Sequence, residues 1–191
     1  MCIICNGGTL EDVMAHIASA VERDGWTIVP VGGEPGRPSW AYTIGLVDHD
    51  HPELVVTDQY LEVGVETLDH LARRVCAGER FDAVVSTRCQ WAPVLGFEVG
   101  FVDVHPAQVD HGVVALWLVH YARPGPDALS EPRLRQVVLP DAAHCHVHQR
   151  TQPLLDTATD VLHAPLANRA ARRAERRTPR RRRRGHGRGR A

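Results

Sequence analysis

Cysteine and histidine, both good zinc ligands, gather at two places in this 191-residue chain. Cys2 and Cys5 form a Cys-x-x-Cys pair, a spacing that lets two thiolates hold one tetrahedral metal ion. Such a site needs two more ligands, and the densest supply is the stretch 144–148, His-Cys-His-Val-His. If that stretch is extended, its three histidines project to one side. The spacing therefore predicts a structural zinc site formed by Cys2, Cys5, His144 and His146.

The same residues allow other interpretations. His105 or His111 could supply a ligand in place of the 144–148 stretch. A single Cys-x-x-Cys pair without a second matched pair is also compatible with thiols that bind nothing. Redox chemistry is a third interpretation, which the position of Cys2 at the extreme terminus disfavours, because a redox pair usually lies between a strand and a helix.

Nucleophilic catalysis would pair Cys145 or Cys89 with a histidine, because imidazole can accept the thiol proton. His144 and His146 are sequence neighbours of Cys145, whereas catalytic pairs are usually brought together by the fold. An enzyme with a Cys/His site near Cys145 therefore remains an alternative. Phosphate-binding Gly-x-x-x-x-Gly-Lys and dinucleotide-binding Gly-x-Gly-x-x-Gly patterns are absent.

The stretch 48–53 offers a weaker cation site. Its potential ligands are Asp48, His49, Asp50, His51 and Glu53. Carboxylates and imidazoles together can bind a divalent cation. A solvated turn is the favoured interpretation, because Asp and Pro are typical turn residues and Pro52 disfavours helix at the residue before it.

Composition limits the class of protein. The hydrophobic content is an ordinary 43%, and no apolar run approaches the roughly 20 residues of a membrane span. The N-terminus lacks the charged and apolar regions of a signal peptide. Five cysteines, an odd number, argue against a disulfide framework. We therefore expect a protein of the reducing cytoplasm that has no contact with membranes.

The net charge of -1 hides a strong asymmetry. Residues 167–191 contain 12 arginines and one acidic residue, a charge of +11, while the preceding residues carry -12. Lysine is absent, so every fixed side-chain cation is an arginine. We expect residues 1–166 to form one domain and residues 167–191 to be a disordered basic tail. Residues 168–191 could contact nucleic acid without sequence preference, or only keep the protein soluble.

Hydrophobic periodicity predicts an α+β fold, with a mostly antiparallel sheet and two or three packed helices. The expected helices are 9–24, 61–77, 107–121 and 152–162, and the expected strands are 26–31, 40–45, 53–57, 83–86, 95–105 and 134–139. In the second strand Trp40, Tyr42 and Ile44 alternate with small residues, as in a strand with one buried face. Gly45 allows another backbone or a ligand to approach closely.

Six short motifs follow one another along the chain: Cys2-Ile-Ile-Cys5, Asp24-Gly-Trp26, Ala41-Tyr-Thr-Ile-Gly-Leu46, Pro52-Glu-Leu-Val-Val56, Arg135-Gln-Val-Val-Leu-Pro-Asp141 and Thr151-Gln-Pro-Leu-Leu155. In these motifs and their order, residues 2–155 resemble DUF4262, a bacterial family of unknown function. Relatives often carry a Trp-Pro-Trp-like segment after the Pro-Asp, where this chain has residues 142–148. The resemblance implies a fold and supplies no mechanism.

Overall fold

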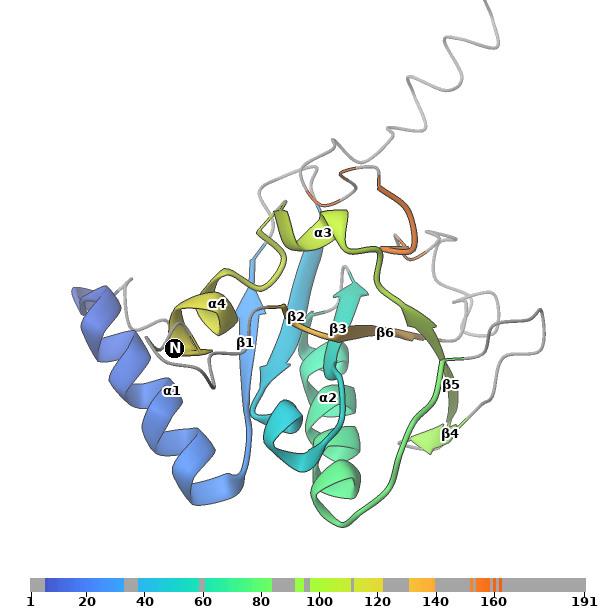
Figure 1. Cartoon of the computed structure of the whole chain (residues 1–191), viewed down its shortest axis with the longest axis horizontal. Coiled ribbons are helices and arrows are strands. Elements are labelled where there is room, and N and C mark those ends of the chain that lie inside the picture. The colour runs from blue at the N-terminus through green and yellow to red at the C-terminus, as the bar shows by residue number, and fades with distance from the viewer. Residues whose placement is uncertain are drawn as a thin grey trace, which may run out of the picture.

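The computed structural model describes residues 6–32, 38–58, 61–83, 92–94, 97–110, 112–121, 131–139, 152, 154–158, 160 and 162. The elements in chain order are α1 (Leu10–Asp24), β1 (Thr27–Val31), β2 (Ser39–Ile44), the 3₁₀ helix η2 (Leu46–His49), β3 (Glu53–Asp58), α2 (Leu61–Cys76), β4 (Ala92–Val94), β5 (Phe97–Asp103), α3 (Ala107–Asp110), α4 (Ala115–Tyr121) and β6 (Leu134–Val138) (Figure 1).

The strands form one sheet in the order β1-β2-β3-β6-β5-β4. Neighbouring strands are antiparallel except β3 and β6, which are parallel. Two long helices, α1 and α2, and two short ones pack against this sheet. The predicted α+β class and mostly antiparallel sheet are confirmed.

Local sequence signals set the first helix. The Thr9 side chain accepts a hydrogen bond from the Asp12 backbone N–H, and the Asp12 carboxylate accepts one from Thr9 N. This capping box satisfies N–H groups that have no partner within the helix. Gly25 ends the helix in the left-handed conformation, with φ of 87°. The predicted helix start, helix end and following strand β1 are confirmed.

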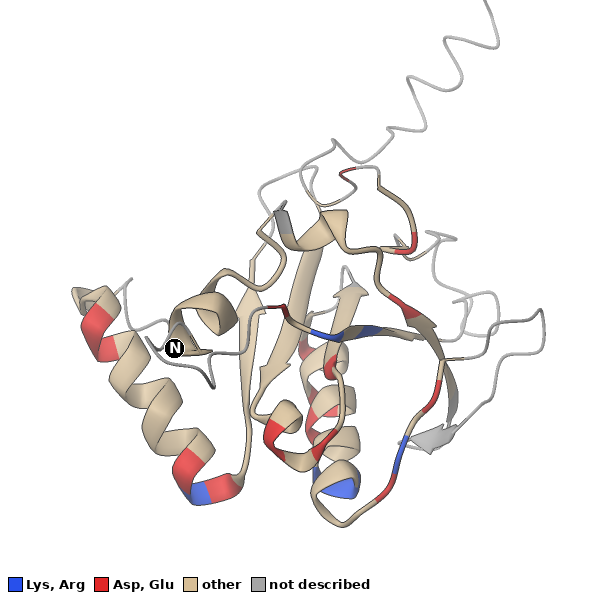
Figure 2. Ribbon diagram, viewed as in Figure 1, with Lys and Arg blue, Asp and Glu red and all other residues tan. Residues whose placement is uncertain are grey.

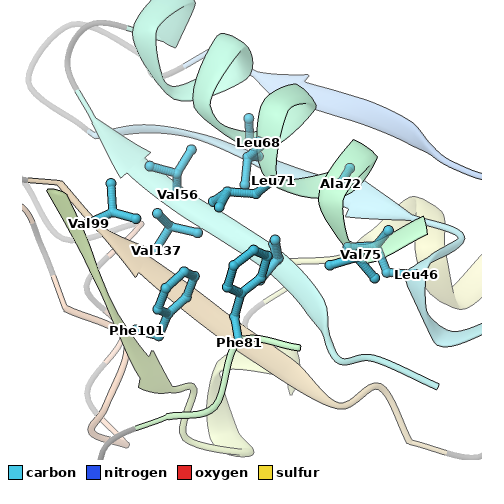
Figure 3. Packing of buried hydrophobic residues seen from close by; sticks show 12 residues of the cluster. Leu46, Val56, Leu68, Leu71, Ala72, Val75, Phe81, Val99, Phe101 and Val137 are labelled. Atoms are coloured by element: carbon cyan, nitrogen blue, oxygen red, sulfur yellow. The ribbon is translucent and has the colours of Figure 1, made fainter. Parts of the chain in front are cut away.

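Both faces of the sheet are covered. On one face, α2 packs over β2 and β3, and Leu68, Leu71 and Val75 contact a core that extends to Phe81 and Phe101 (Figure 3). On the other face lie α1 and α4, which contribute Ile17 and Trp117.

Strand β2 is therefore buried on both faces. Trp40, Tyr42 and Ile44 face α1 and α4, and all three are buried as expected. The intervening Ala41 and Thr43 are buried as well. The prediction of one buried face is thus wrong, because β2 lies between β1 and β3 and has a helix layer on each side.

One predicted helix is divided in two, and another is wrong. The stretch 107–121 is not one helix but two, α3 and α4, with Gly112 between them at a φ of 79°. In the stretch 152–162, the described residues are not helical. They lie along the sheet instead, where Leu155 N donates to Gln136 Oε1 at 2.7 Å and Leu155 O accepts from His105 N at 2.7 Å.

Several expectations cannot be compared with these elements. Of the predicted strand 83–86, only Ala83 lies within the described residues, and it is not in a strand. The predicted basic tail and the end of the 1–166 domain also lie outside the described residues. Within the ranges given above, no helix has both the length and the apolar character needed to cross a membrane.

Candidate functional site

The turn between β2 and β3 is built around the carboxylate of Glu53. Gly45 begins it with a φ of 120°, η2 follows, and Asp50 closes it in the left-handed region at 54°. This geometry points the first backbone N–H groups of η2 inward, where they have no partner within the helix. Glu53, the first residue of β3, is fully buried and supplies the missing acceptor.

Five donors of the protein reach the two oxygens of Glu53. They are Gly45 N at 2.9 Å, Val47 N at 3.4 Å and Trp117 Nε1 at 3.1 Å on Oε1, and Thr43 Oγ1 at 2.7 Å and Leu46 N at 3.3 Å on Oε2. Burial raises the pKa of Glu53 to about 7, although the hydrogen bonds from Thr43, Gly45, Val47 and Trp117 oppose the shift. Because these donors occupy both oxygens, Glu53 organises the turn and is not free to bind a substrate or a metal.

Gly45 holds this turn against the end of α1. A Cβ on Gly45 would lie 2.5 Å from Gly25 O and 2.9 Å from Trp26 Cα. The predicted close approach is thus made by backbone, at the end of an inner strand of the sheet. Two of the family-like motifs, Asp24-Gly-Trp26 and the one that contains Gly45, meet at this contact.

A thiol and an imidazole meet beside the same turn. Cys76, the last residue of α2, has its Sγ 3.4 Å from Nε2 of His49. The Gly25 backbone lies against both groups, since a Cβ there would be 2.9 Å from His49 Nε2. The 3.4 Å between Sγ of Cys76 and Nε2 of His49 is close enough for an imidazole to accept the proton of a thiol nucleophile. Burial raises the pKa of the Cys76 thiol, and the carboxylate of Glu53 raises it further. The C-terminal end of a helix also disfavours a thiolate, so Cys76 is held in its thiol form.

His51 is fixed through both ring nitrogens. Its Nδ1 lies 2.6 Å from the carbonyl oxygen of Pro52, and its Nε2 accepts a hydrogen bond from Phe81 N at 3.2 Å. The side chain is buried. Burial, the largest of several causes, lowers the pKa of His51 below its ordinary value. His51 therefore holds the segment after α2 against the start of β3.

The stretch 48–53 is therefore not a solvated turn throughout. Asp48 and Asp50 are exposed, whereas His51 and Glu53 point into the core and bond to the protein itself. Across the described residues, no group of three or more His, Cys, Asp or Glu side chains could hold a metal ion. The divalent-cation interpretation of this stretch has no support in the geometry.

The predicted zinc ligands Cys2, Cys5, His144 and His146 lie outside the described residues, as do Cys89, His111, Cys145 and His148. His105 is described. It is exposed after β5, and Ala107 N donates to its Nδ1 at 3.2 Å.

The structure does describe Leu139 and Gln152, the nearest residues on either side of the stretch 144–148. Gln152 Oε1 accepts from Leu139 N at 2.8 Å, and Gln152 Nε2 donates to Val137 O at 2.8 Å. One amide thus completes the hydrogen bonding at the end of β6 in the way that a neighbouring strand would. Residues 139 and 152 are held together, and residues 140–151 connect them.

Sequence reasoning missed Cys76, Trp117 and the role of Glu53. A glutamate that begins an apolar strand run, Glu53-Leu-Val-Val56, was the available signal, because a charged residue is seldom fully buried without a partner. Nothing local pointed to Trp117, which lies 64 residues away. The Cys76 and His49 contact likewise joins groups 27 residues apart.

Comparison with known proteins gives one match. The model of a family described as a domain of unknown function, DUF4262, matches residues 20–150, more than half of the chain. The matched range includes the Glu53 turn and the 144–148 stretch, and it leaves out Cys2 and Cys5. No curated protein and no solved structure matches the chain.

Proposed function

We propose that this chain, which belongs to the DUF4262 family, is an accessory binding module stabilised by a structural zinc ion. Cys2, Cys5, His144 and His146 would hold the metal. Two thiolates and two imidazoles are a donor set that zinc accepts in closed structural sites. Such an ion would join the N-terminus of the domain to the connection that follows β6.

The observation that carries this proposal is the clamp formed by Gln152. By bonding Val137 and Leu139, it brings the ends of the stretch 140–151 to one point at the end of β6. Holding the ends of a loop together removes part of the entropy that the chain would lose when the loop's side chains bind a ligand. Two loop histidines would therefore lose less freedom on binding zinc than histidines in a free tail.

The described domain supports binding over catalysis. Its most perturbed acid, Glu53, is occupied by five donors of the protein. The thiol of Cys76 faces an imidazole, but its pKa is raised, opposite to what an activated nucleophile needs. Both arrangements stabilise the β2–β3 turn and leave no group prepared for reaction.

Metal analysis of protein purified without a histidine tag tests the proposal. We expect close to one zinc per chain in the wild type, loss of zinc in Cys2→Ser/Cys5→Ser and in His144→Ala/His146→Ala, and retention in Cys76→Ser. Cys76→Ser is the matched control, because it removes a thiol that the structure places in the domain. Metal-free wild-type protein, or zinc that survives in the Cys2/Cys5 variant, would overturn the proposal. Metal-free protein would favour the alternative of a catalytic thiol near Cys145.

A second candidate function is contact with nucleic acid through residues 168–191. Five arginines of the described domain each lie within 4.0 Å of a carboxylate: Arg23, Arg73, Arg74, Arg133 and Arg135. Figure 2 shows acidic residues on α1, η2 and α2. Since the body is acidic overall, an anionic polymer would have to be attracted by the arginines of residues 168–191.

A further inference from the structure

The two hydrogen bonds of the His51 ring, to Pro52 and from Phe81, can both form in only one protonation state of the histidine. A carbonyl oxygen can only accept, so Nδ1 of His51 must donate to Pro52 O. A backbone N–H can only donate, so Nε2 must accept from Phe81 N. The network therefore requires the neutral imidazole with its proton on Nδ1. A proton on Nε2 would set one donor against another.

Phe81 is the anchor of the segment that follows α2. Its ring stacks on Phe101, with centroids 5.0 Å apart and planes 9° apart (Figure 3). The ring centroids of Phe81 and His51 lie 5.9 Å apart, and the two ring planes are 81° from each other. The Arg74 guanidinium lies over the Phe81 ring at 5.0 Å from its centroid. Phe81 O accepts from Arg135 Nη1. The side chain is 6% exposed and belongs to the core under α2.

The charges around His51 oppose an imidazolium. Arg135 on β6 and Arg80 next to Phe81 both disfavour the charged ring, while Asp82 favours it. Arg135 is itself held by Asp103 at 3.0 Å and lies 3.8 Å from Asp82. The guanidinium of Arg74 on α2 lies over the ring of Phe81. A protonated His51 would thus add a cation to a largely buried place that already holds arginines.

We propose that His51 and Phe81 form a pH-sensitive latch that holds residues 79–83 on the sheet when His51 is neutral and releases them when it is protonated. Release removes the Phe81 ring from Phe101 and opens the core under the end of α2. The latch has a closed and an open state. Protonation shifts their populations, because a proton binds well to His51 only in the open state.

The direction of the pH dependence follows from linkage. Burial lowers the pKa of the latched His51, whereas in the open state the ring titrates near its ordinary value of 6.5. The latch is therefore fully formed above about pH 6.5 and weakens as the pH falls below it. The open population grows by up to about tenfold for each pH unit below that value, until the latched pKa is reached.

Amide hydrogen exchange of the full chain, read residue by residue, tests the latch. We expect the protection factor of the Phe81 amide to fall by up to about fivefold between pH 6.5 and 5.5, before most of the latched His51 rings become protonated. His51→Gln keeps an acceptor near the Nε2 position and does not titrate, so its Phe81 protection factor should stay constant. His105→Ala, which removes an exposed histidine, should behave as the wild type.

Two results would overturn the latch. One is a Phe81 protection factor that is the same at pH 6.5 and at pH 5.5. The other is a fall of the same size in His51→Gln as in the wild type. If His51→Gln does not fold, the ring nitrogen shifts of wild-type His51 still decide, because a proton found on Nε2 at pH 7.5 contradicts the proposed neutral form.

Discussion

Trp117 donates its indole N–H to the carboxylate of Glu53 at 3.1 Å, joining α4 to the start of β3 within the core. The neighbouring backbone is bound in a similar way, since Trp40 Nε1 donates to Val113 O at 3.0 Å and Tyr42 accepts from Leu116 N at 3.1 Å. The segment 113–117 is thus fastened to β2 and β3 by three hydrogen bonds. The turn that η2 forms and the layer that α4 forms share one buried acid.

Replacing Trp117 with Phe should destabilise the protein by more than the same change at Trp40. Trp117→Phe removes a donor from a buried carboxylate, and bonds to charged groups are worth about 1.5–3 kcal/mol. Trp40→Phe removes a donor from a neutral carbonyl, worth about 0.5–1.5 kcal/mol. Both indoles are buried, so the loss of ring area is similar. Urea denaturation of both variants at pH 8 gives the comparison, and equal losses would argue against a charged Glu53.

Glu53 gives the protein a distinctive pH dependence of stability. Its pKa is about 7 in the folded protein and its ordinary value is 4.5. Between these values the folded state keeps the proton that the unfolded state releases. The contribution of Glu53 to the free energy of unfolding should therefore fall as the pH rises through this window, by roughly 3 kcal/mol in total.

Glu53→Gln isolates this contribution because glutamine does not titrate. The difference in free energy of unfolding between wild type and variant, measured in urea from pH 4.5 to 7.5, should decrease with pH. The contribution of His51 has the opposite sign below pH 6.5 and cancels in the difference, since both proteins contain it. A difference that rises with pH would mean that the five donors outweigh burial and that the folded pKa lies below 4.5.

Among the glycines that the structure describes, Gly45 is the one at which an added methyl group should disturb the fold most. Gly45→Ala would place a Cβ 2.5 Å from Gly25 O at a φ of 120°, so it should cost about 3–5 kcal/mol from overpacking and backbone strain. Gly78→Ala is the matched control, because Gly78 has a φ of 98° and open space around it. That variant should lose only about 1–2 kcal/mol. Thermal unfolding of the two variants decides, and equal costs would show that the contact with Gly25 relaxes easily.

The sequence was informative where the cause is local. The capping box of Thr9 and Asp12 and the stop at Gly25 lie within one helix, so α1 could be predicted closely. The break at Gly112 could not, because it depends on the bonds that Trp40 and Tyr42 make to the segment 113–117. The amphipathic pattern of 107–121 is real, but tertiary hydrogen bonds override it.

The candidate site was harder to predict for the same reason. Glu53 was expected only as a strand residue or a cation ligand, and its donors come from β2, η2 and α4. The stretch 152–162 has modest helical periodicity, yet Gln152 and Leu155 form hydrogen bonds with β6, and the described residues of this stretch are not helical. Residue types alone do not show which backbone groups remain unpaired after the sheet has formed.

The charge distribution leads to the last prediction, on residues 168–191. If they attract nucleic acid, full-length protein should bind a short DNA duplex at low salt, and the affinity should fall steeply as salt rises, because binding releases counterions. Protein lacking residues 168–191 should not bind, since the remaining body is acidic. Fluorescence anisotropy with a labelled duplex, at two salt concentrations, measures both.

A variant of full length separates charge from chain length. Replacing the five arginines from Arg180 to Arg184 with glutamine removes five of the 12 arginines in residues 167–191 and keeps every other residue. Its affinity should lie between those of the full-length and truncated proteins, with a shallower dependence on salt, because fewer phosphates are neutralised. Duplexes of unrelated sequence should bind alike, since these residues contain no aromatic side chain to stack on bases. Equal affinity of the full-length and truncated proteins would exclude an interaction through these residues and leave them a role in solubility.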